Sequence, residues 1–146
     1  MFNFFKKKEK AKDLEKNAFL NDFTEEQKAA MVYSLMLMTG ANGSYDEKKL
    51  NYTMQQAKLL NLNLEGKAMA IYQEKNADYA YSIIKRIPEE KKGWYSVLLG
   101  SILGIGGKPT EKELTLIARI VEQCGISEKD FHDVNTKTQA LMKNIK

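Results

Sequence analysis

Apolar residues recur along this chain at helical spacing, and no sustained alternation of apolar and polar positions is bounded by hairpin turns. Both prolines, Pro88 and Pro109, fall at boundaries between the expected helices, where they interrupt no interior hydrogen bond. The pattern therefore predicts an all-α fold, a single-domain bundle of about seven helices.

Two of the expected helices are apolar on nearly every side. The first follows a capping box formed by Thr24 and Gln27, and its apolar run covers residues 29–38. The second begins with Pro88 at its first position and extends to about Ile105. We expect these two helices to be central, buried and crossed. The buried bulk of the second is predicted to come from Trp94, Val97, Leu98, Ile102 and Leu103.

Each central helix is followed by an amphipathic helix that begins after a glycine-containing loop. Ser44 or Asp46 caps the first, and a second capping box, Thr110 and Glu113, opens the other. The inward stripe of the first is predicted to be Leu50, Met54, Ala57 and Leu60. That of the second is predicted to be Leu114, Ile117, Ala118, Val121 and Cys124.

Four shorter helices complete the expected bundle. They cover residues 13–23, 64–73 and 77–87, and a last segment capped by Ser127. The helix over 64–73 is predicted to direct inward Leu64, Ala68, Ile71 and Tyr72. The helix over 77–87 is predicted to direct inward Ala80, Ile83, Ile84 and Ile87. The last segment is predicted to direct inward Phe131, Val134, Leu141 and Ile145.

Residues 24–63 match residues 88–127 without a gap, at an offset of about 64 residues. Five identical pairs carry the match: Gly40, Gly43, Glu47, Lys48 and Leu50 recur as Gly104, Gly107, Glu111, Lys112 and Leu114. We therefore expect two pseudo-repeated halves, about 24–87 and 88–146, within one domain covering 13–146. The halves cannot be independent domains, because each apolar helix needs the other half to cover it.

The net charge of +4 is concentrated near the amino terminus, where residues 6–12 hold five lysines and one glutamate. The neutral remainder argues against a nucleic-acid-binding face. No apolar run reaches the length of a membrane span. Cys124 is the only cysteine, so an intrachain disulfide is excluded and a reducing, cytoplasmic location is expected.

Residues 1–12 form a basic and aromatic arm. Its candidate interaction residues are Phe2, Phe4, Phe5, Lys6, Lys7 and Lys8. Phenylalanines beside lysines are typical of weak attachment to an anionic membrane surface or to an acidic protein partner. Two alternatives remain open: a frayed, solvated terminus, and phenylalanines that fold back onto the helical body.

No constellation in the sequence supports a reaction, so we expect a non-enzymatic protein without a cofactor. His132 is the only histidine, and neither it nor Cys124 has a sequence neighbour suited to metal ligation or nucleophilic catalysis. The glycine loops match neither a P-loop nor an EF-hand. The methionines are read as core residues, with an adaptable binding groove as the alternative: Met31, Met36, Met38, Met54 and Met69.

The unit of apolar helix, glycine loop, glutamate and amphipathic helix, present twice, resembles the TerB-like family of tellurite-resistance proteins. The resemblance rests on the segments Gly40-Ala-Asn-Gly-Ser-Tyr-Asp-Glu-Lys-Lys-Leu50 and Gly104-Ile-Gly-Gly-Lys-Pro-Thr-Glu-Lys-Glu-Leu114 and covers about residues 24–134. It implies a small helical interaction module linked with metal or stress responses and with complexes at the inner face of the membrane.

The alternative function is a metal- or small-ligand-binding protein that uses carboxylates near the two loops, because loop Asp-Gly pairs and a following Glu are associated with metal in the family that the chain resembles. This chain has Asn42 and Gly106 where the two loop aspartates would stand and Lys49 in place of the first Glu, so only Glu113 matches. The carboxylates left near the loops are Asp46, Glu47, Glu111 and Glu113. Since a hard cation needs several converging oxygens, we expect no tight divalent-ion site.

Overall fold

A computed structural model describes residues 23–127, and these residues contain helices and no strand. The elements are α2 (Glu25–Thr39), α3 (Glu47–Leu59), α4 (Lys67–Ala70), the 3-10 helix η1 (Ile71–Gln73), α5 (Ala77–Lys85), α6 (Glu89–Gly104) and α7 (Glu111–Gln123). The all-α prediction is confirmed for this part of the chain. The arm, the expected helix before Phe23 and the one after Ser127 lie outside the described residues.

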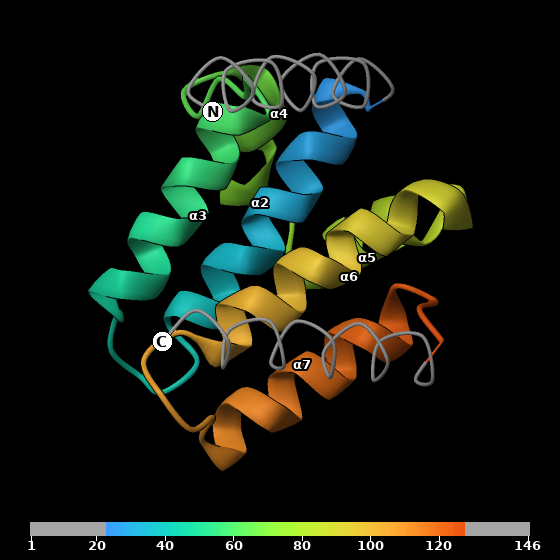
Figure 1. Cartoon of the computed structure of the whole chain (residues 1–146). Helices are drawn as coiled ribbons and strands as arrows, with labels where there is room; N and C mark the ends of the chain where they lie inside the picture. Colours follow the sequence, from blue (N-terminus) through green and yellow to red (C-terminus); the bar gives the residue numbers. More distant parts are fainter. Residues whose placement is uncertain (1–22, 128–146) are drawn as a thin grey trace, which may run out of the picture.

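Helix α2 is the hub of the described bundle. It packs against α3, α4, α5, α6 and α7, and Figure 1 shows α6 crossing it while α3 lies alongside. The capping box of Thr24 and Gln27 begins α2 as predicted, with a distance of 3.1 Å from the Gln27 amide nitrogen to Thr24 Oγ1. Its buried residues surround the helix: Ala29, Ala30, Met31, Val32, Ser34, Leu35, Met38 and Thr39.

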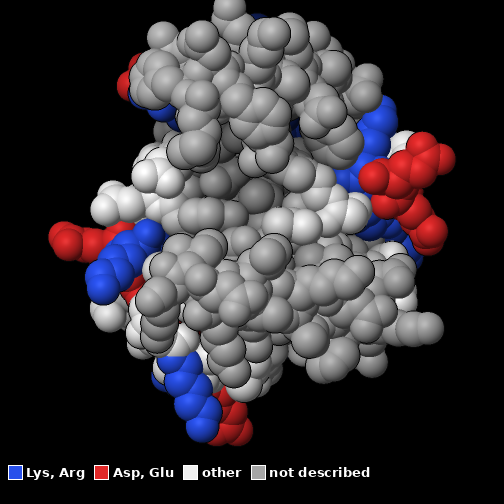
Figure 2. Space-filling view, viewed as in Figure 1, with Lys and Arg blue, Asp and Glu red and all other residues white. Residues whose placement is uncertain are grey.

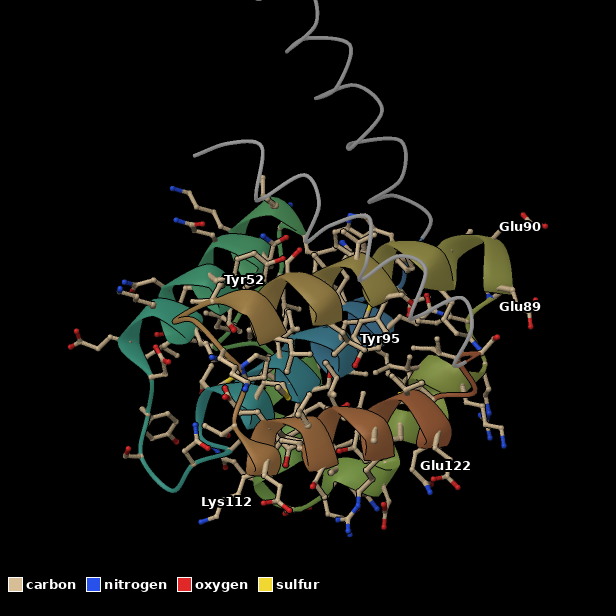
Figure 3. All side chains as sticks on the ribbon, turned by 60° about the horizontal axis from the view of Figure 1, so that its bottom comes forward. Tyr52, Glu89, Glu90, Tyr95, Lys112 and Glu122 are labelled. Atoms are coloured by element: carbon tan, nitrogen blue, oxygen red, sulfur yellow. The ribbon has the colours of Figure 1, made fainter. Side chains whose placement is uncertain are left out.

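One buried polar contact lies at the crossing of α2 and α6. The hydroxyl oxygens of Ser34 and Tyr95 are 2.5 Å apart, and both residues are fully buried. Ser34 donates its only hydroxyl proton to Met31 O at 2.6 Å, so Tyr95 is the donor to Ser34. Figure 3 shows Tyr95 directed into the protein, whereas Glu89, Glu90, Lys112 and Glu122 point outward.

A buried lysine ties two helix ends together. The Lys92 ammonium on α6 donates to Lys85 O at 3.0 Å and to Cys124 O at 3.2 Å, and the residue is 7% exposed. Lys85 ends α5 and Cys124 is the C-cap of α7. A cation is favourable there, because the last carbonyls of a helix carry partial negative charge and lack intrahelical donors.

The predicted inward faces of α3 and α7 are both wrong by one residue at their amino-terminal ends. On α3 the buried positions are Lys49, Thr53, Ala57 and the C-cap Leu60, while Leu50 and Met54 are only half-buried. On α7, Glu113 is buried and Leu114 is 48% exposed. Ile120 is buried in place of the exposed Ala118, and Ile117, Val121 and Cys124 are buried as predicted. A lysine and a glutamate thus occupy the inward positions assigned to leucines.

The helix expected over residues 64–73 begins later and is shorter. The Asn63 side chain accepts from the Glu65 amide at 3.0 Å, and α4 starts only at Lys67. Leu64, expected inside, is 40% exposed, and Ala68, Ile71 and Tyr72 are half-buried. A side-chain bond of this kind stabilises a turn in competition with a helix.

Two further predictions concern helices α5 and α6. Helix α5 ends at Lys85, slightly before the predicted limit, and its expected inward residues Ala80, Ile83, Ile84 and Ile87 are all buried. On α6, Pro88 is the N-cap rather than the first helical residue, and Val97 is 39% exposed while Trp94 is half-buried. Leu98, Ile102 and Leu103 are buried as predicted. Tyr95, which was not predicted inside, is fully buried.

The rotated face of α7 gives a paired stability prediction. Leu114→Ala should change the free energy of unfolding by no more than about 0.5 kcal/mol, because the side chain is largely exposed. Ile117→Ala should cost about 2–5 kcal/mol, since Ile117 is only 4% exposed. Urea denaturation measures both; an equal or larger loss for Leu114→Ala would contradict the register.

Candidate functional site

The loop between α2 and α3 and the loop between α6 and α7 meet at a polar cluster that we call the loop junction. Its members are Asn42, Asp46, Lys49, Ile105, Gly106, Thr110 and Glu113. The first turns of α3 and α7 supply Lys49 and Glu113, and the loops supply the rest. Two of the four candidate carboxylates, Asp46 and Glu113, lie in this junction.

Lys49 lies at the centre of the loop junction, with a side chain that is 4% exposed. Its Nζ is 2.7 Å from Glu113 Oε2, 2.6 Å from Ile105 O and 3.6 Å from Asp46 Oδ2. Glu113 Oε2 and Ile105 O lie within hydrogen-bonding distance of the ammonium, and Asp46 Oδ2 is a longer ion-pair partner. The lysine therefore joins α3 to the C-cap of α6 and to the first turn of α7.

Glu113 uses both carboxylate oxygens. Oε1 accepts from the Thr110 amide at 2.9 Å, which completes the capping box of α7, while Oε2 binds Lys49. Burial alone would raise the pKa of Glu113. The hydrogen bonds from Lys49 and from the Thr110 backbone, together with the lysine charge, outweigh burial and leave the pKa lowered.

Asp46 caps α3 and also faces the lysine. Its Oδ1 accepts from the amides of Lys48 and Lys49 at 2.9 and 3.2 Å, and these bonds with the Lys49 charge lower its pKa against a smaller effect of burial. Gly106 approaches the same carboxylate. A Cβ on Gly106 would lie 3.3 Å from Asp46 Oδ2. The backbone φ of Gly106 is +89°, which residues other than glycine rarely adopt.

Asn42 and Thr110 form the outer edge of the loop junction. The Thr110 hydroxyl donates to Asn42 Oδ1 at 2.6 Å and accepts from the Glu113 amide at 3.2 Å. Thr110 is thus both the N-cap of α7 and a direct link between the two loops. Both residues are exposed, in contrast to the buried ion pair beneath them.

The contacts of the loop junction join positions that correspond in the sequence register. Lys49 and Glu113 occupy the same place in the two matching segments, as do the caps Asp46 and Thr110. α3 and α7 have 13 residues each, and both start directly after these caps. Positive φ also recurs at matching positions: Gly43 and Gly107 after the central helices, Asn61 and Gly125 after the amphipathic ones.

The four candidate metal ligands are divided by the structure. Asp46 and Glu113 lie on either side of the Lys49 ammonium, while Glu47 and Glu111 are exposed in the first turns of α3 and α7. Within residues 23–127, no three His, Cys, Asp or Glu side chains lie close enough together to hold a metal ion. A lysine cation occupies the place between the nearest carboxylates.

The other candidate residues are buried or half-buried side chains, or they lie outside the described residues. Cys124 is fully buried as expected, and burial raises the pKa of its thiol to about 12, so the reactive thiolate is disfavoured. Met31 and Met38 are buried core residues, and the other three methionines are half-buried. Phe2, Phe4, Phe5, the lysines of the arm and His132 are outside the described residues.

Sequence reasoning missed the residue at the centre of the site. Lys49 was treated as a departure from a metal-binding pattern, and Asn42 likewise, although both contact the second loop. The signal that could have found the ion pair is the register itself, because Lys49 and Glu113 are opposite charges at equivalent positions.

No family model, curated protein or solved structure matches this chain.

The lowered pKa of Glu113 predicts a specific loss of stability in acid. A carboxyl whose pKa is lowered by folding stabilises the protein above its ordinary titration range, and that contribution disappears as the pH falls through the folded-state pKa. Glu113→Gln removes the charge but keeps a capping side chain, since Gln27 fills the same role in the first capping box. The stability gap between the parent and this variant should therefore narrow as the pH is lowered. Urea denaturation across the acid range measures it, and a gap independent of pH would contradict the assignment.

The Lys49 ammonium also predicts weak competition by metal ions. Mg²⁺, Ca²⁺ or Zn²⁺ should raise the midpoint of thermal unfolding no more than NaCl of equal ionic strength, because the nearest carboxylates already share a cation. Differential scanning fluorimetry tests this. A metal-specific increase that Asp46→Asn abolishes would establish a divalent site here.

Proposed function

We propose that this chain is a non-enzymatic helical interaction module, TerB-like in its construction, which attaches through its amino-terminal arm to an anionic membrane surface and presents a protein-binding body there. The proposal includes a cytoplasmic location, peripheral to the inner face of the membrane, and the link with metal or stress responses that the resemblance implies. No nucleic acid or cofactor is part of it.

The observation that carries this proposal is that the charged side chains of the loop junction are bonded to one another. The Lys49 ammonium lies within hydrogen-bonding distance of Glu113 Oε2 and Ile105 O, with Asp46 Oδ2 as an ion-pair partner at 3.6 Å, and both Glu113 oxygens are engaged. A catalytic or metal-binding group needs some capacity left for a ligand, whereas these groups bind one another. The two loops therefore have a structural role in this proposal. Partner and membrane binding are assigned to the surface of the body and to the arm.

The proposal also includes two pseudo-repeated halves, about 24–87 and 88–146. Four observations support a duplication: the equal lengths of α3 and α7, the matching caps, the matching positive φ angles and the ion pair between equivalent positions. In this account the two halves are copies of one ancestral unit, and the equivalent positions Lys49 and Glu113 diverged to opposite charges.

Charges of both signs are mixed where Figure 2 shows the described residues. On the face shown in Figure 2, the coloured lysine and arginine side chains stand next to aspartate or glutamate side chains. Large apolar side chains are exposed singly on several elements: Tyr45, Leu59, Leu64, Val97 and Leu114. Scattered exposure of this kind is ordinary for a soluble surface. The lysines of residues 6–12 therefore supply the charge excess that membrane attraction needs.

The arm predicts weak, salt-sensitive binding to anionic vesicles. Each lysine adds about 1 kcal/mol near an anionic surface and each buried phenylalanine up to about 1.5–3 kcal/mol, while ordering the arm costs roughly 1–2 kcal/mol per residue. The full chain should co-sediment with phosphatidylserine-containing vesicles at low salt and less at high salt. Replacing Lys6, Lys7 and Lys8 by glutamine should abolish most of the binding.

A matched control removes the same charge from the body. Lys48, Lys58 and Lys108 are exposed, and their joint replacement by glutamine should leave vesicle binding nearly unchanged if the arm is the anchor. A further variant with Phe2, Phe4 and Phe5 replaced by serine tests the apolar contribution. Equal losses from the arm and body lysine variants would show a general charge effect, and no binding by the parent would reject the lipid anchor.

A further inference from the structure

We propose that Asn42 is a site of spontaneous deamidation, and that the Thr110 hydroxyl from the opposite loop activates its side-chain amide. Asn42 and Gly43 form the only Asn-Gly dipeptide in the chain. Asparagine is a chemically labile residue, and a following glycine leaves the backbone nitrogen that attacks its side chain unshielded. The inference is independent of the proposed membrane function.

The surroundings of the dipeptide leave room for the reaction. Asn42 and Gly43 are both exposed, and a Cβ built on Gly43 would meet no atom within 4 Å. Gly43 also has a φ of +90°, which lies outside the conformations that most side chains allow. Water can therefore reach both residues, and no atom lies over the position that a Gly43 side chain would take.

The Asn42 amide is held on one side only. Its Oδ1 accepts the Thr110 hydroxyl proton at 2.6 Å, while no described residue accepts a hydrogen bond from its Nδ2. A donor on the carbonyl oxygen draws electron density from Cγ and stabilises the negative charge that develops on that oxygen when a nucleophile adds. The amino group that must leave faces no competing partner.

The reaction needs water and no other reagent. Water or hydroxide removes the amide proton of Gly43, and the nitrogen attacks Asn42 Cγ. The new N–Cγ bond closes a five-membered succinimide as the Cγ–Nδ2 bond breaks and Nδ2 leaves as ammonia. Water then opens the ring at either carbonyl, which gives aspartate or isoaspartate at position 42. The Gly43 amide now donates to Gly40 O at 3.1 Å, so this bond must open first.

The products alter the loop junction differently. Aspartate at position 42 adds a negative charge but still has an oxygen to accept from Thr110. Isoaspartate adds a methylene to the main chain of the loop, which displaces the side chain from Thr110. Since Thr110 also caps α7, the modification acts on a contact that joins the two loops.

The test uses the full chain incubated at neutral and mildly alkaline pH, followed by peptide mapping with mass spectrometry. Asn42 should be converted faster than Asn51, Asn61, Asn63 and Asn76, none of which precedes glycine. The product peptide should carry the mass difference between a hydroxyl and an amino group, and Asn42→Gln should abolish it. Conversion of Asn42 no faster than that of the other asparagines would overturn the site.

Two variants at position 110 test the activating hydroxyl separately from the helix cap. Thr110→Ser keeps both the cap and the donor and should deamidate like the parent. Thr110→Asp keeps a good N-cap but has no proton to donate at neutral pH, and it should deamidate several-fold more slowly. Unfolding midpoints of both variants check that the cap is preserved. Equal rates in the two variants would overturn the role of Thr110.

Discussion

The buried ion pair between Lys49 and Glu113 constrains the described fold more than any other polar contact. Both side chains are 4% exposed, and their charged atoms are 2.7 Å apart. Removing one member of such a pair leaves an uncompensated buried charge and costs about 3–5 kcal/mol, whereas replacing both by apolar residues can be neutral or stabilising. The pair therefore specifies how α3 and α7 must face each other, and adds less to net stability than its geometry suggests.

Several features around the pair are consequences of this arrangement. Glycine is favoured at position 106 because the φ there is +89° and a Cβ would lie 3.3 Å from Asp46 Oδ2, and the Thr110 cap is coupled to the pair through Glu113. Lys92 shows the same principle elsewhere, with a buried ammonium matched to helix-end carbonyls. In both places the cation lies where helix C-termini supply oxygens. Both buried lysines thus hold helix ends together.

Local signals predicted the helix starts well and the buried faces less well. Thr24, Asp46 and Thr110 cap helices as the sequence indicated, because an N-cap depends on neighbours within three residues. The stripes of α3 and α7 were misplaced because the leucines were assigned to the interior. Lys49 and Glu113 can be buried only because they meet, and that meeting joins residues far apart in the sequence. Tyr95 is similar, since its buried hydroxyl is bonded to Ser34, which is also far away in the sequence.

The loop junction explains why a glycine loop followed by an acidic helix need not form a ligand site. Its lysine and carboxylates contact one another, so the loops act as a joint between helices.

The double-mutant cycle of Lys49→Met and Glu113→Gln, measured by urea denaturation, tests this joint most directly. Two groups in direct contact should couple by about 0.5–3 kcal/mol, so the double variant should lose clearly less stability than the two single losses combined. Losses that simply add would show that Lys49 and Glu113 act independently and would contradict the central role of the pair.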